Sequence, residues 1–314
     1  MPDPKARQAY AALVRDLAAP SGLFREGDGS YAHAWPFSQA LAAAISIGNA
    51  GEVRRLVDLL PSYLDHGAYN ATVSAPSGAG RQFFDDNEWL ALDLVDAWRL
   101  LHDRTVLQQA RRVFGWITSG WDRNVAHACS GGVYWTKTTA ITDRNTVTTA
   151  NGAVLALELY QETHDRGYLG WGKRMYAWVG SCLADGDGLL FDHLDADGRV
   201  DETKWTYNQG AMVAAASLLY RATGSAAYLR DATSLANRSL RYFDASGYDG
   251  QPAIFVAIYF RYLRVLASIR PQPQIAAALA HYVAADQASA AGTDSDVLDR
   301  AAAVQLAAEL TRLR

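Results

Sequence analysis

The sequence predicts an all-α protein, an (α/α)6 barrel of six helical hairpins with little or no strand. Twelve stretches carry apolar residues at helical spacing, and short polar turns separate them. Similar hairpins begin at Asn87, Asn151 and Gln209, roughly 60 residues apart. Alternate helices are rich in Ala and Leu on nearly all sides, as a buried inner ring requires. Because no linker interrupts the pattern, residues 1–314 are expected to form one domain.

The first half of the chain contains six expected helices. Pro36 suits the first turn of the second helix, because its fixed φ is helical and its missing N–H is not needed there. Gly48 and Gly51 separate the second helix from the third. The turn residues of 74–80 predict a loop, and G-G-V-Y-W within 122–145 predicts a short strand or a lid. The six helices are expected at 5–18, 36–48, 51–66, 86–103, 105–121 and 146–164.

The second half contains six more expected helices. The Gly- and Asp-rich stretch 185–193 predicts a turn that could include a short strand. Aspartates of this region lack the spacing and the terminal Glu of an EF-hand loop, so we expect turn residues and no calcium site. They are Asp185, Asp187, Asp192, Asp195 and Asp197. The helices are expected at 168–184, 207–223, 226–243, 252–269, 273–289 and 296–313.

Composition excludes several classes of function. A net charge of −4 without a basic cluster argues against a nucleic-acid partner. No window approaches 18 uninterrupted apolar residues, so no membrane span is expected. The seven histidines show no ligand spacing, and no metal or other cofactor is expected. The pattern leaves the oligomeric state open.

The cysteines and the first residues bear on the location of the protein. Cys129 and Cys182 are too few for a disulfide framework and do not resemble a metal-binding set. Residues 1–10 contain no apolar signal core. A cytoplasmic, reducing location is the simplest interpretation. Only four of the 29 basic residues are lysines, which hints at a GC-rich bacterial genome.

The stretch Q-F-F-D-D-N-E-W-L-A-L contains two neighbouring carboxylates, Asp85 and Asp86, at the start of an expected helix. Either could cap that helix, since a side-chain oxygen there accepts a free backbone N–H. One cap does not need two acids, however, and adjacent like charges repel each other. The flanking Phe83, Asn87 and Trp89 therefore favour a functional pair over a cap beside a solvated acid.

The inner helices of such a barrel run parallel, so their N-termini and their free N–H groups gather at one end. Residues around the expected helix starts are acids, amides and aromatics. Amides and carboxylates bind sugar hydroxyls, and Trp and Tyr faces cover sugar rings, although helix caps and core packing are duller explanations for each residue. The candidates for sugar binding are Trp35, Gln39, Phe84, Asn87, Asn145, Asn151, Trp205, Tyr207, Asn208 and Gln209.

Four motifs together resemble glycoside hydrolase family 76 between about residues 81 and 243. They are F-F-D-D-N-E-W-L-A-L-D-L-V-D-A-W, C-S-G-G-V-Y-W, N-T-V-T-T-A-N-G-A-V-L-A-L-E-L-Y and W-T-Y-N-Q-G. The family has the (α/α)6 fold and includes retaining endo-α-1,6-mannanases and fungal relatives thought to be wall transglycosidases. The resemblance implies that Asp85 is the nucleophile and Asp86 the general acid/base, with Trp135 of the second motif among the sugar contacts.

We therefore expect a retaining glycosidase that cleaves α-1,6-linked mannose oligosaccharides or mannan-type glycans by double displacement. Without a signal peptide, shorter oligosaccharides or mannosylated lipid precursors fit better than extracellular mannan. The segment E-W-L-A-L replaces the family's usual aromatic-rich stretch, and the N-terminal third matches loosely, which puts the outer subsites in doubt. Alternatives are a transglycosidase, a sugar epimerase, an unsaturated-uronyl hydrolase and a non-catalytic carbohydrate-binding protein. An epimerase of this fold needs histidine bases, which the expected inner-helix starts do not supply.

Overall fold

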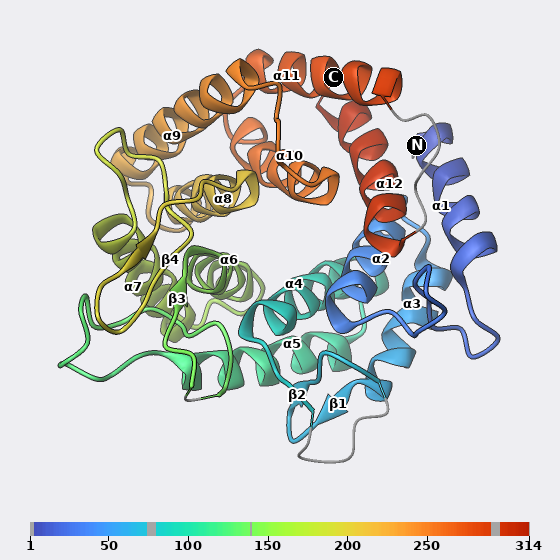
Figure 1. The fold of residues 1–314 in the computed structure, drawn as a ribbon, viewed down its shortest axis with the longest axis horizontal. Helices are drawn as coiled ribbons and strands as arrows, with labels where there is room; N and C mark the ends of the chain where they lie inside the picture. Colours follow the sequence, from blue (N-terminus) through green and yellow to red (C-terminus); the bar gives the residue numbers. More distant parts are fainter. Residues whose placement is uncertain (1–2, 74–79, 139, 290–295, 314) are drawn as a thin grey trace.

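The computed structural model describes residues 3–73, 80–138, 140–289 and 296–313, and these form two concentric rings of α-helices (Figure 1). The inner helices are α2 (Ala34–Ser46), α4 (Phe84–Leu101), α6 (Thr146–Thr163), α8 (Thr206–Thr223), α10 (Ala253–Ala267) and α12 (Val297–Arg312). The outer helices are α1 (Pro4–Leu17), α3 (Ala50–Leu59), α5 (Arg104–Ile117), α7 (Arg166–Cys182), α9 (Ala226–Ala245) and α11 (Pro273–Ser289). The predicted (α/α)6 barrel is confirmed.

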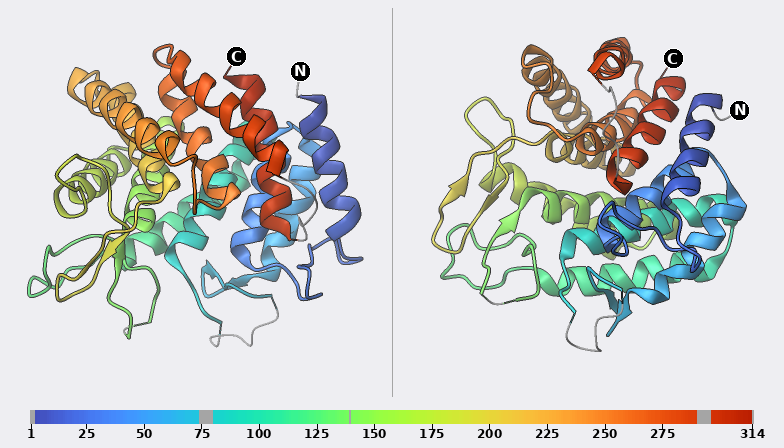
Figure 2. Two further views of the ribbon diagram at one scale, coloured as in Figure 1. Left: turned by 45° about the horizontal axis from the view of Figure 1, so that its top comes forward. Right: turned by 45° about the vertical axis from the view of Figure 1, so that its right-hand side comes forward.

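The inner ring closes because α12 contacts both α10 and α2. The N-terminal helix α1 packs on the outside of α12, so the two chain ends lie side by side (Figure 2). Inner helices are buried on nearly all sides and approach closely where a residue is small. A Cβ on Gly210 of α8 would lie 3.1 Å from the Tyr259 Cα of α10. The Ala-rich sequence of the inner helices is therefore a packing requirement.

Helix caps differ between the two rings. Outer helices α3, α5 and α7 begin with Asn49, Asp103 and Asp165, whose side chains accept backbone N–H groups of the first turn. In five inner helices the side chain of the N-cap residue makes no capping hydrogen bond; these residues are His33, Phe83, Asn145, Trp205 and Pro252. The positive ends of the inner-helix dipoles gather at one end of the barrel, where other parts of the chain accept first-turn N–H groups, as the Ala71 carbonyl does for Ala34 and the Trp135 carbonyl for Phe84.

The structure departs from the predicted elements in a few places. The helix expected at 51–66 ends at Leu59, because Pro61 in the following 3₁₀ turn cannot continue an α-helical hydrogen-bond ladder. The loop expected at 74–80 lies outside the described residues except for Gly80. Short strands connect the helices, as the prediction of little strand allows: β1 (Leu64–Asp65), β2 (Ala68–Tyr69), β3 (Arg144–Asn145), β4 (His193–Leu194) and β5 (Val200–Asp201). Among the described residues, no helix has the length and apolar character to cross a bilayer.

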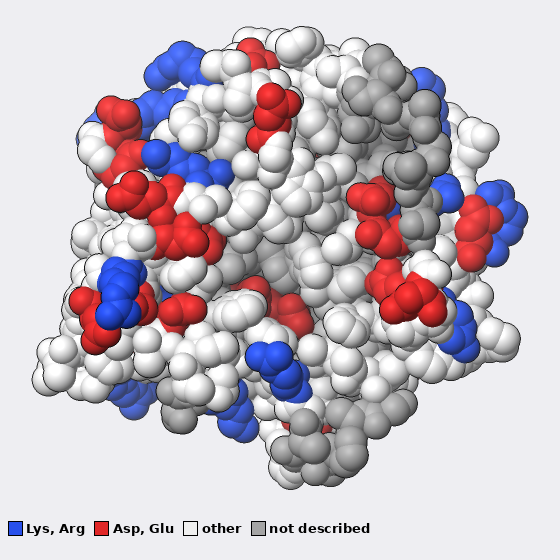
Figure 3. All heavy atoms as spheres, in the orientation of Figure 1, with Lys and Arg blue, Asp and Glu red and all other residues white. Residues whose placement is uncertain are grey.

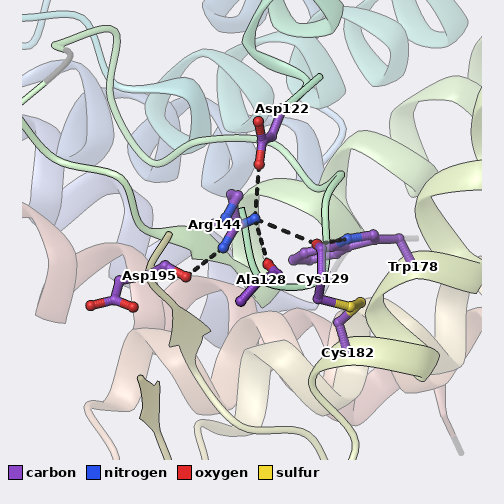
Figure 4. The surroundings of a disulfide bond; sticks show 7 residues. All are labelled: Asp122, Ala128, Cys129, Arg144, Trp178, Cys182 and Asp195. Carbon is purple, nitrogen blue, oxygen red and sulfur yellow. Dashed lines mark hydrogen bonds and ion pairs between the residues drawn. A yellow bond between two sulfur atoms is a disulfide. The ribbon is translucent and has the colours of Figure 1, made fainter. Parts of the chain in front are cut away.

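Cys129 and Cys182 form a disulfide, although the sequence suggested neither a disulfide framework nor an oxidising location (Figure 4). The bond ties the connection between α5 and α6 to the end of α7. Beside it, the fully buried Arg144 donates to the Asp122 carboxylate at 2.8 Å and to the Ala128 carbonyl at 3.0 Å. Arg144 is thus a support for these loops and does not line a cavity.

Removing the disulfide should destabilise the protein strongly. The two cysteines are 53 residues apart in sequence. Closing a loop of that length stabilises a protein by about 4 kcal/mol, so removing the bond should lower the free energy of unfolding by that amount. We expect the Cys129→Ser/Cys182→Ser variant to show that loss in urea denaturation. A denaturation midpoint equal to that of the wild-type protein would contradict this expectation.

Candidate active site

A cavity of about 330 Å³ opens at the end of the barrel where the inner helices begin. Figure 3 views the molecule from this end and shows acidic atoms in and around a central hollow. Five of the predicted site residues line the cavity: Asp85, Asp86, Trp35, Trp135 and Tyr207. The other lining residues are His33, Pro36, Ala71, Phe83, Trp89, Val147 and Phe255.

The start of α4 places both acids in the cavity. Phe83 is the N-cap residue, so Asp85 and Asp86 belong to the first helical turn and neither is the capping residue. The sequence-based boundary at 86 was two residues too late, because Phe84 already has helical geometry and stacks on Trp116 outside the cavity, at a centroid distance of 4.3 Å. First-turn acids are favoured there by the helix dipole.

Asp85 accepts the hydrogen bonds of the pair. The indole N–H of Trp135 donates to its Oδ2 at 3.2 Å, and the backbone N–H of Asp86 donates to its Oδ1 at 3.1 Å. Burial raises the pKa of Asp85 to about 6, although these hydrogen bonds oppose the rise. Asp85 thus accepts a helix-start N–H group through its contact with the Asp86 amide.

Asp86 receives no hydrogen bond to its carboxylate from the described residues. Burial raises its pKa well above the usual value, and the charge of Asp85 raises it further. Asp86 therefore holds its proton to a higher pH than Asp85 does. Two residues of the same type thus differ in proton affinity, which is the condition for acid–base catalysis by paired carboxyls.

A third carboxyl lies beneath the pair, one helical turn further along α4. Glu88 is fully buried, and no described residue hydrogen-bonds to either of its oxygens. Burial raises its pKa well above the usual value, and the charge of Asp85 adds to the rise. Gly152 of α6 leaves room for it, since a Cβ there would lie 3.3 Å from Oε1. The burial of Glu88 thus favours its neutral form over a second charge beside Asp85.

Aromatic rings form the sides of the cavity. The Trp35 and Trp89 rings lie 5.3 Å apart, and Phe83 lies 5.0 Å from Trp135, both in tilted arrangements. On the third side Tyr207 contacts Phe255 edge to face. Such walls suit the apolar faces of a sugar ring, while the two carboxyls suit its polar edge.

Most of the predicted amides serve the fold and do not line the cavity. Asn87 exchanges two hydrogen bonds with the backbone of Tyr69, and Gln209 exchanges two with the backbone of Leu190. In each case a side chain near an inner-helix start holds the preceding hairpin. Both residues are fully buried, and these contacts use the groups that were expected to bind sugar.

The remaining predicted amides also lie in the interior. Gln39 contacts Gln305 of α12, and Asn151 accepts a hydrogen bond from the Tyr262 hydroxyl at 2.8 Å. Asn145, the N-cap residue of α6, is also buried. Trp205 is the N-cap residue of α8 and packs edge to face on Phe255, next to the cavity. None of these residues is among the cavity-lining residues.

Asn208 contacts Asp192, an acid that the sequence analysis assigned only to a turn. Its amide N–H donates to Asp192 Oδ1 at 3.2 Å. The charge of Asp192 contributes to the raised pKa of both Asp85 and Tyr207, so this carboxylate lies near the cavity. No sequence signal distinguished Asp192 from its neighbouring turn aspartates.

Other lining residues missed by the sequence analysis have identifiable signals. Trp89 follows Asp85 by four residues, which places both on one face of α4. Phe255 and Val147 lie in the first turns of α10 and α6, where lining residues were expected, but their apolar side chains resemble core residues in sequence. His33 precedes α2 and contradicts the expectation that inner-helix starts supply no histidine.

Three residues near the cavity could approach a metal ion. Asp192, His193 and Asp201 offer ligand atoms that all lie within 4.8 Å of one another. His193 Nδ1 already lies 2.9 Å from the Asp192 carboxylate, and that hydrogen bond raises the pKa of the imidazole. The pairing satisfies these side chains without a metal, and the absence of a metal cofactor stays a prediction.

Comparison with known sequences places these features in a family. A model of glycosyl hydrolase family 76 matches residues 16–306. The mannan endo-1,6-alpha-mannosidase DCW1 of Saccharomyces cerevisiae is 30% identical over 190 residues, which cover 53% of this chain and 41% of that protein. The match therefore spans less than half the length of this curated relative.

Solved structures share the whole fold. The family 76 mannosidase Bt3792 of Bacteroides thetaiotaomicron superposes with a TM-score of 0.84 at 22% identity, covering 98% of this chain and 97% of that one. An inactive variant of the α-1,6-mannanase GH76A of Salegentibacter sp. HEL1_6, in complex with α-1,6-mannotriose, gives a TM-score of 0.80 at 21% identity, covering 98% of both chains. At these identities the likeness establishes the architecture.

Proposed function

The chain belongs to glycosyl hydrolase family 76, and on that premise we propose that it hydrolyses α-1,6-linked mannose oligosaccharides with retention of configuration. The observation that carries the proposal is the unequal environment of two adjacent acids in one cavity. Asp85 accepts two hydrogen bonds, whereas Asp86 accepts none from the described residues. A retaining glycosidase needs this pairing of an ionised and a protonated carboxyl.

In the first step, the Asp85 carboxylate attacks the anomeric carbon of the mannose. The bond from that carbon to O6 of the leaving sugar breaks, and the Asp86 proton moves to O6. The product is a glycosyl ester on Asp85. The indole of Trp135 keeps the attacking carboxylate in place through its hydrogen bond to Oδ2.

In the second step, the Asp86 carboxylate accepts a proton from water as that water attacks the same carbon. The ester bond breaks, Asp85 regains its charge, and Asp86 regains its proton. Two inversions give net retention. The aromatic walls of Trp35, Trp89 and Phe83 cover the sugar during both steps and limit access of other water.

The transglycosidase alternative shares the first step and differs only in the acceptor. A sugar hydroxyl would replace water in the second step, and nothing in the cavity distinguishes the two acceptors. His33 removes one argument against an epimerase, but family membership favours the glycosidase chemistry. A binding protein without turnover would not need the unequal protonation of Asp85 and Asp86.

A linkage comparison tests the proposed substrate. The wild-type protein is incubated with α-1,6-, α-1,3- and α-1,2-linked mannotriose, and the products are separated and weighed by mass spectrometry. Release of mannose or mannobiose from the α-1,6 isomer alone supports the proposal. Turnover of another isomer with none of the α-1,6 isomer overturns the substrate assignment.

The pH profile should reflect the two acids. Activity requires Asp85 ionised and Asp86 protonated, so kcat/KM on α-1,6-mannotriose should fall as the pH drops through about 6, the pKa of Asp85. It should fall again at high pH as Asp86 loses its proton, with the two limbs belonging to the coupled pair. A profile that keeps rising below pH 5 would contradict the assignment.

The location remains a prediction. Disulfides are rare in reducing compartments, so the Cys129–Cys182 bond counts against the cytoplasmic location expected from the sequence and favours an oxidising one. Alkylation of free thiols during lysis of the source cells, followed by mass spectrometry, tests it directly. Unmodified cysteines indicate an oxidising location, and full alkylation indicates the cytoplasm. The bacterial origin inferred from lysine usage is likewise still a prediction.

A further inference from the structure

A second pocket of about 280 Å³ adjoins the cavity through a shared pair of extended segments. Phe83 and Thr136 form a bridge between these segments, and the Lys137 amide donates to the Gln82 carbonyl at 3.3 Å. Phe83 and Trp135 line the catalytic cavity, whereas their chain neighbours line the second pocket. The lining residues are Asp65, His66, Gly80, Arg81, Gln82, Thr136, Lys137 and Thr138.

The second pocket carries positive charge in an acidic neighbourhood. Arg81 and Lys137 are exposed, and neither forms an ion pair with a carboxylate in the described part of the chain. The Asp65 carboxylate is engaged by His66 at 2.7 Å. Lys204, by contrast, pairs with Asp185 at 2.8 Å. Among the described residues, Arg81 and Lys137 are therefore not used to neutralise a neighbouring acid.

The basic group is connected to the nucleophile through a pair of tilted aromatic rings. The Arg81 guanidinium lies 5.2 Å from the centroid of Phe83, and Phe83 lies 5.0 Å from Trp135. The Trp135 indole in turn donates to Asp85. A substituent on a sugar bound beside Phe83 would therefore lie within reach of Arg81.

We propose that this basic pocket, formed by Arg81, Lys137 and His66, binds a phosphate monoester carried by the glycan, so that phosphorylated α-1,6-mannosides are preferred over neutral ones. The proposal rests on the proposed function. A monoester carries a charge near −2 at neutral pH and three acceptor oxygens. The guanidinium fork takes two of these oxygens, and the lysine ammonium takes the third. A carboxylate carries only one negative charge and would therefore neutralise only one of the two cations.

A purely structural role makes a different prediction. Arg81 would then only cover the face of Phe83 through a cation–π contact, and Lys137 would only be solvated. Replacing either cation would affect neutral and phosphorylated substrates alike. The ratio of the two specificity constants therefore separates the two roles.

The experiment compares kcat/KM for α-1,6-mannotriose with that for the same trisaccharide carrying one phosphate monoester, on either terminal residue. Four proteins are assayed: wild type, Arg81→Gln, Lys137→Gln and the control Arg123→Gln. Arg123 is exposed and outside the pocket, so its replacement makes the same change in net charge. We expect wild type to prefer one phosphorylated isomer over the neutral trisaccharide. In each pocket variant the ratio of kcat/KM for that isomer to kcat/KM for the neutral trisaccharide should be about tenfold lower, the effect of one charge-assisted hydrogen bond. The control should keep the wild-type ratio.

Equal ratios in all four proteins would overturn the basic pocket as a phosphate site while leaving the mannosidase proposal intact. An equal loss in the Arg123 variant would also overturn it, because net charge alone would then explain the preference. If wild type cleaves neither saccharide, the proposed function fails. Titration calorimetry with the same saccharides then decides whether the basic pocket binds the phosphate monoester. Tighter binding of a phosphorylated isomer that both pocket variants lose supports the site, and equal or absent binding overturns it.

Discussion

Replacing Asp85 with Asn is expected to lower kcat on α-1,6-mannotriose by at least about 10⁴-fold, the scale on which loss of a nucleophile acts. An amide cannot form the glycosyl ester at useful rates, although its oxygen can still accept the Trp135 indole N–H that the carboxylate accepts at 3.2 Å. The fold should therefore be preserved. Steady-state kinetics and thermal denaturation, measured on the same preparation, check both parts.

A matched control separates chemistry from helix stability. Asp96 lies on the same helix α4, away from the catalytic cavity, where it pairs with Arg99 at 3.0 Å. Asp96→Asn removes the same charge from the same helix and should keep activity within a few-fold, since a surface ion pair contributes at most about 1 kcal/mol. Comparable losses in the two variants would mean that Asp85 acts through stability, against the nucleophile assignment.

Replacing Asp86 with Asn should cost about 10²- to 10⁴-fold on the natural linkage, the contribution of a positioned general acid. The loss should shrink for a mannoside with an activated leaving group such as 2,4-dinitrophenolate, because that group departs without a proton. The alkaline limb of the pH profile should also disappear. Both changes follow from a protonated Asp86, whose pKa is raised by burial and by the charge of Asp85.

Azide provides a sharper readout on the Asp86 variant. Azide can attack the glycosyl ester on Asp85 without a general base, so it should restore turnover and yield the α-mannosyl azide. If Asp86 instead served as the nucleophile and Asp85 as the acid, azide would rescue the Asp85 variant and yield the α-mannosyl azide there, whereas direct replacement of a missing nucleophile by azide gives the β-azide. That result would reverse the two roles.

The fold could be predicted from the sequence because its main determinant is local. Apolar spacing identifies each helix, and the contrast between the inner α6, buried on nearly all sides, and the amphipathic outer α5 is visible in the residues themselves. Boundaries shifted where the signal was ambiguous. At Asp85 and Asp86 the first helical turn resembles a cap in sequence, because acids are favoured at both positions.

Which polar residues line the cavity and which hold the fold together could not be predicted in the same way. Asn87 and Tyr207 both lie near the start of an inner helix, yet Asn87 holds the Tyr69 backbone and Tyr207 lines the cavity. The difference depends on the direction in which each side chain points and on where the preceding hairpin returns. Both are tertiary properties that residue type and spacing do not encode.

The Cys129–Cys182 disulfide was missed for a similar reason. Two cysteines in a long chain carry no framework signal, and their pairing depends on the loop before α6 reaching the end of α7. Asp192 was also assigned only to a turn, because its proximity to Asp85 comes from the packing of β4 beside the start of α8. Non-local contacts account for both errors.

The anomer released first from α-1,6-mannotriose tests the double-displacement mechanism most directly. Proton NMR, recorded before mutarotation of the new reducing end, distinguishes α from β through the anomeric signal. Attack by Asp85 followed by attack of water predicts the α anomer. Initial release of the β anomer would show a single displacement by water and would contradict the covalent role of Asp85.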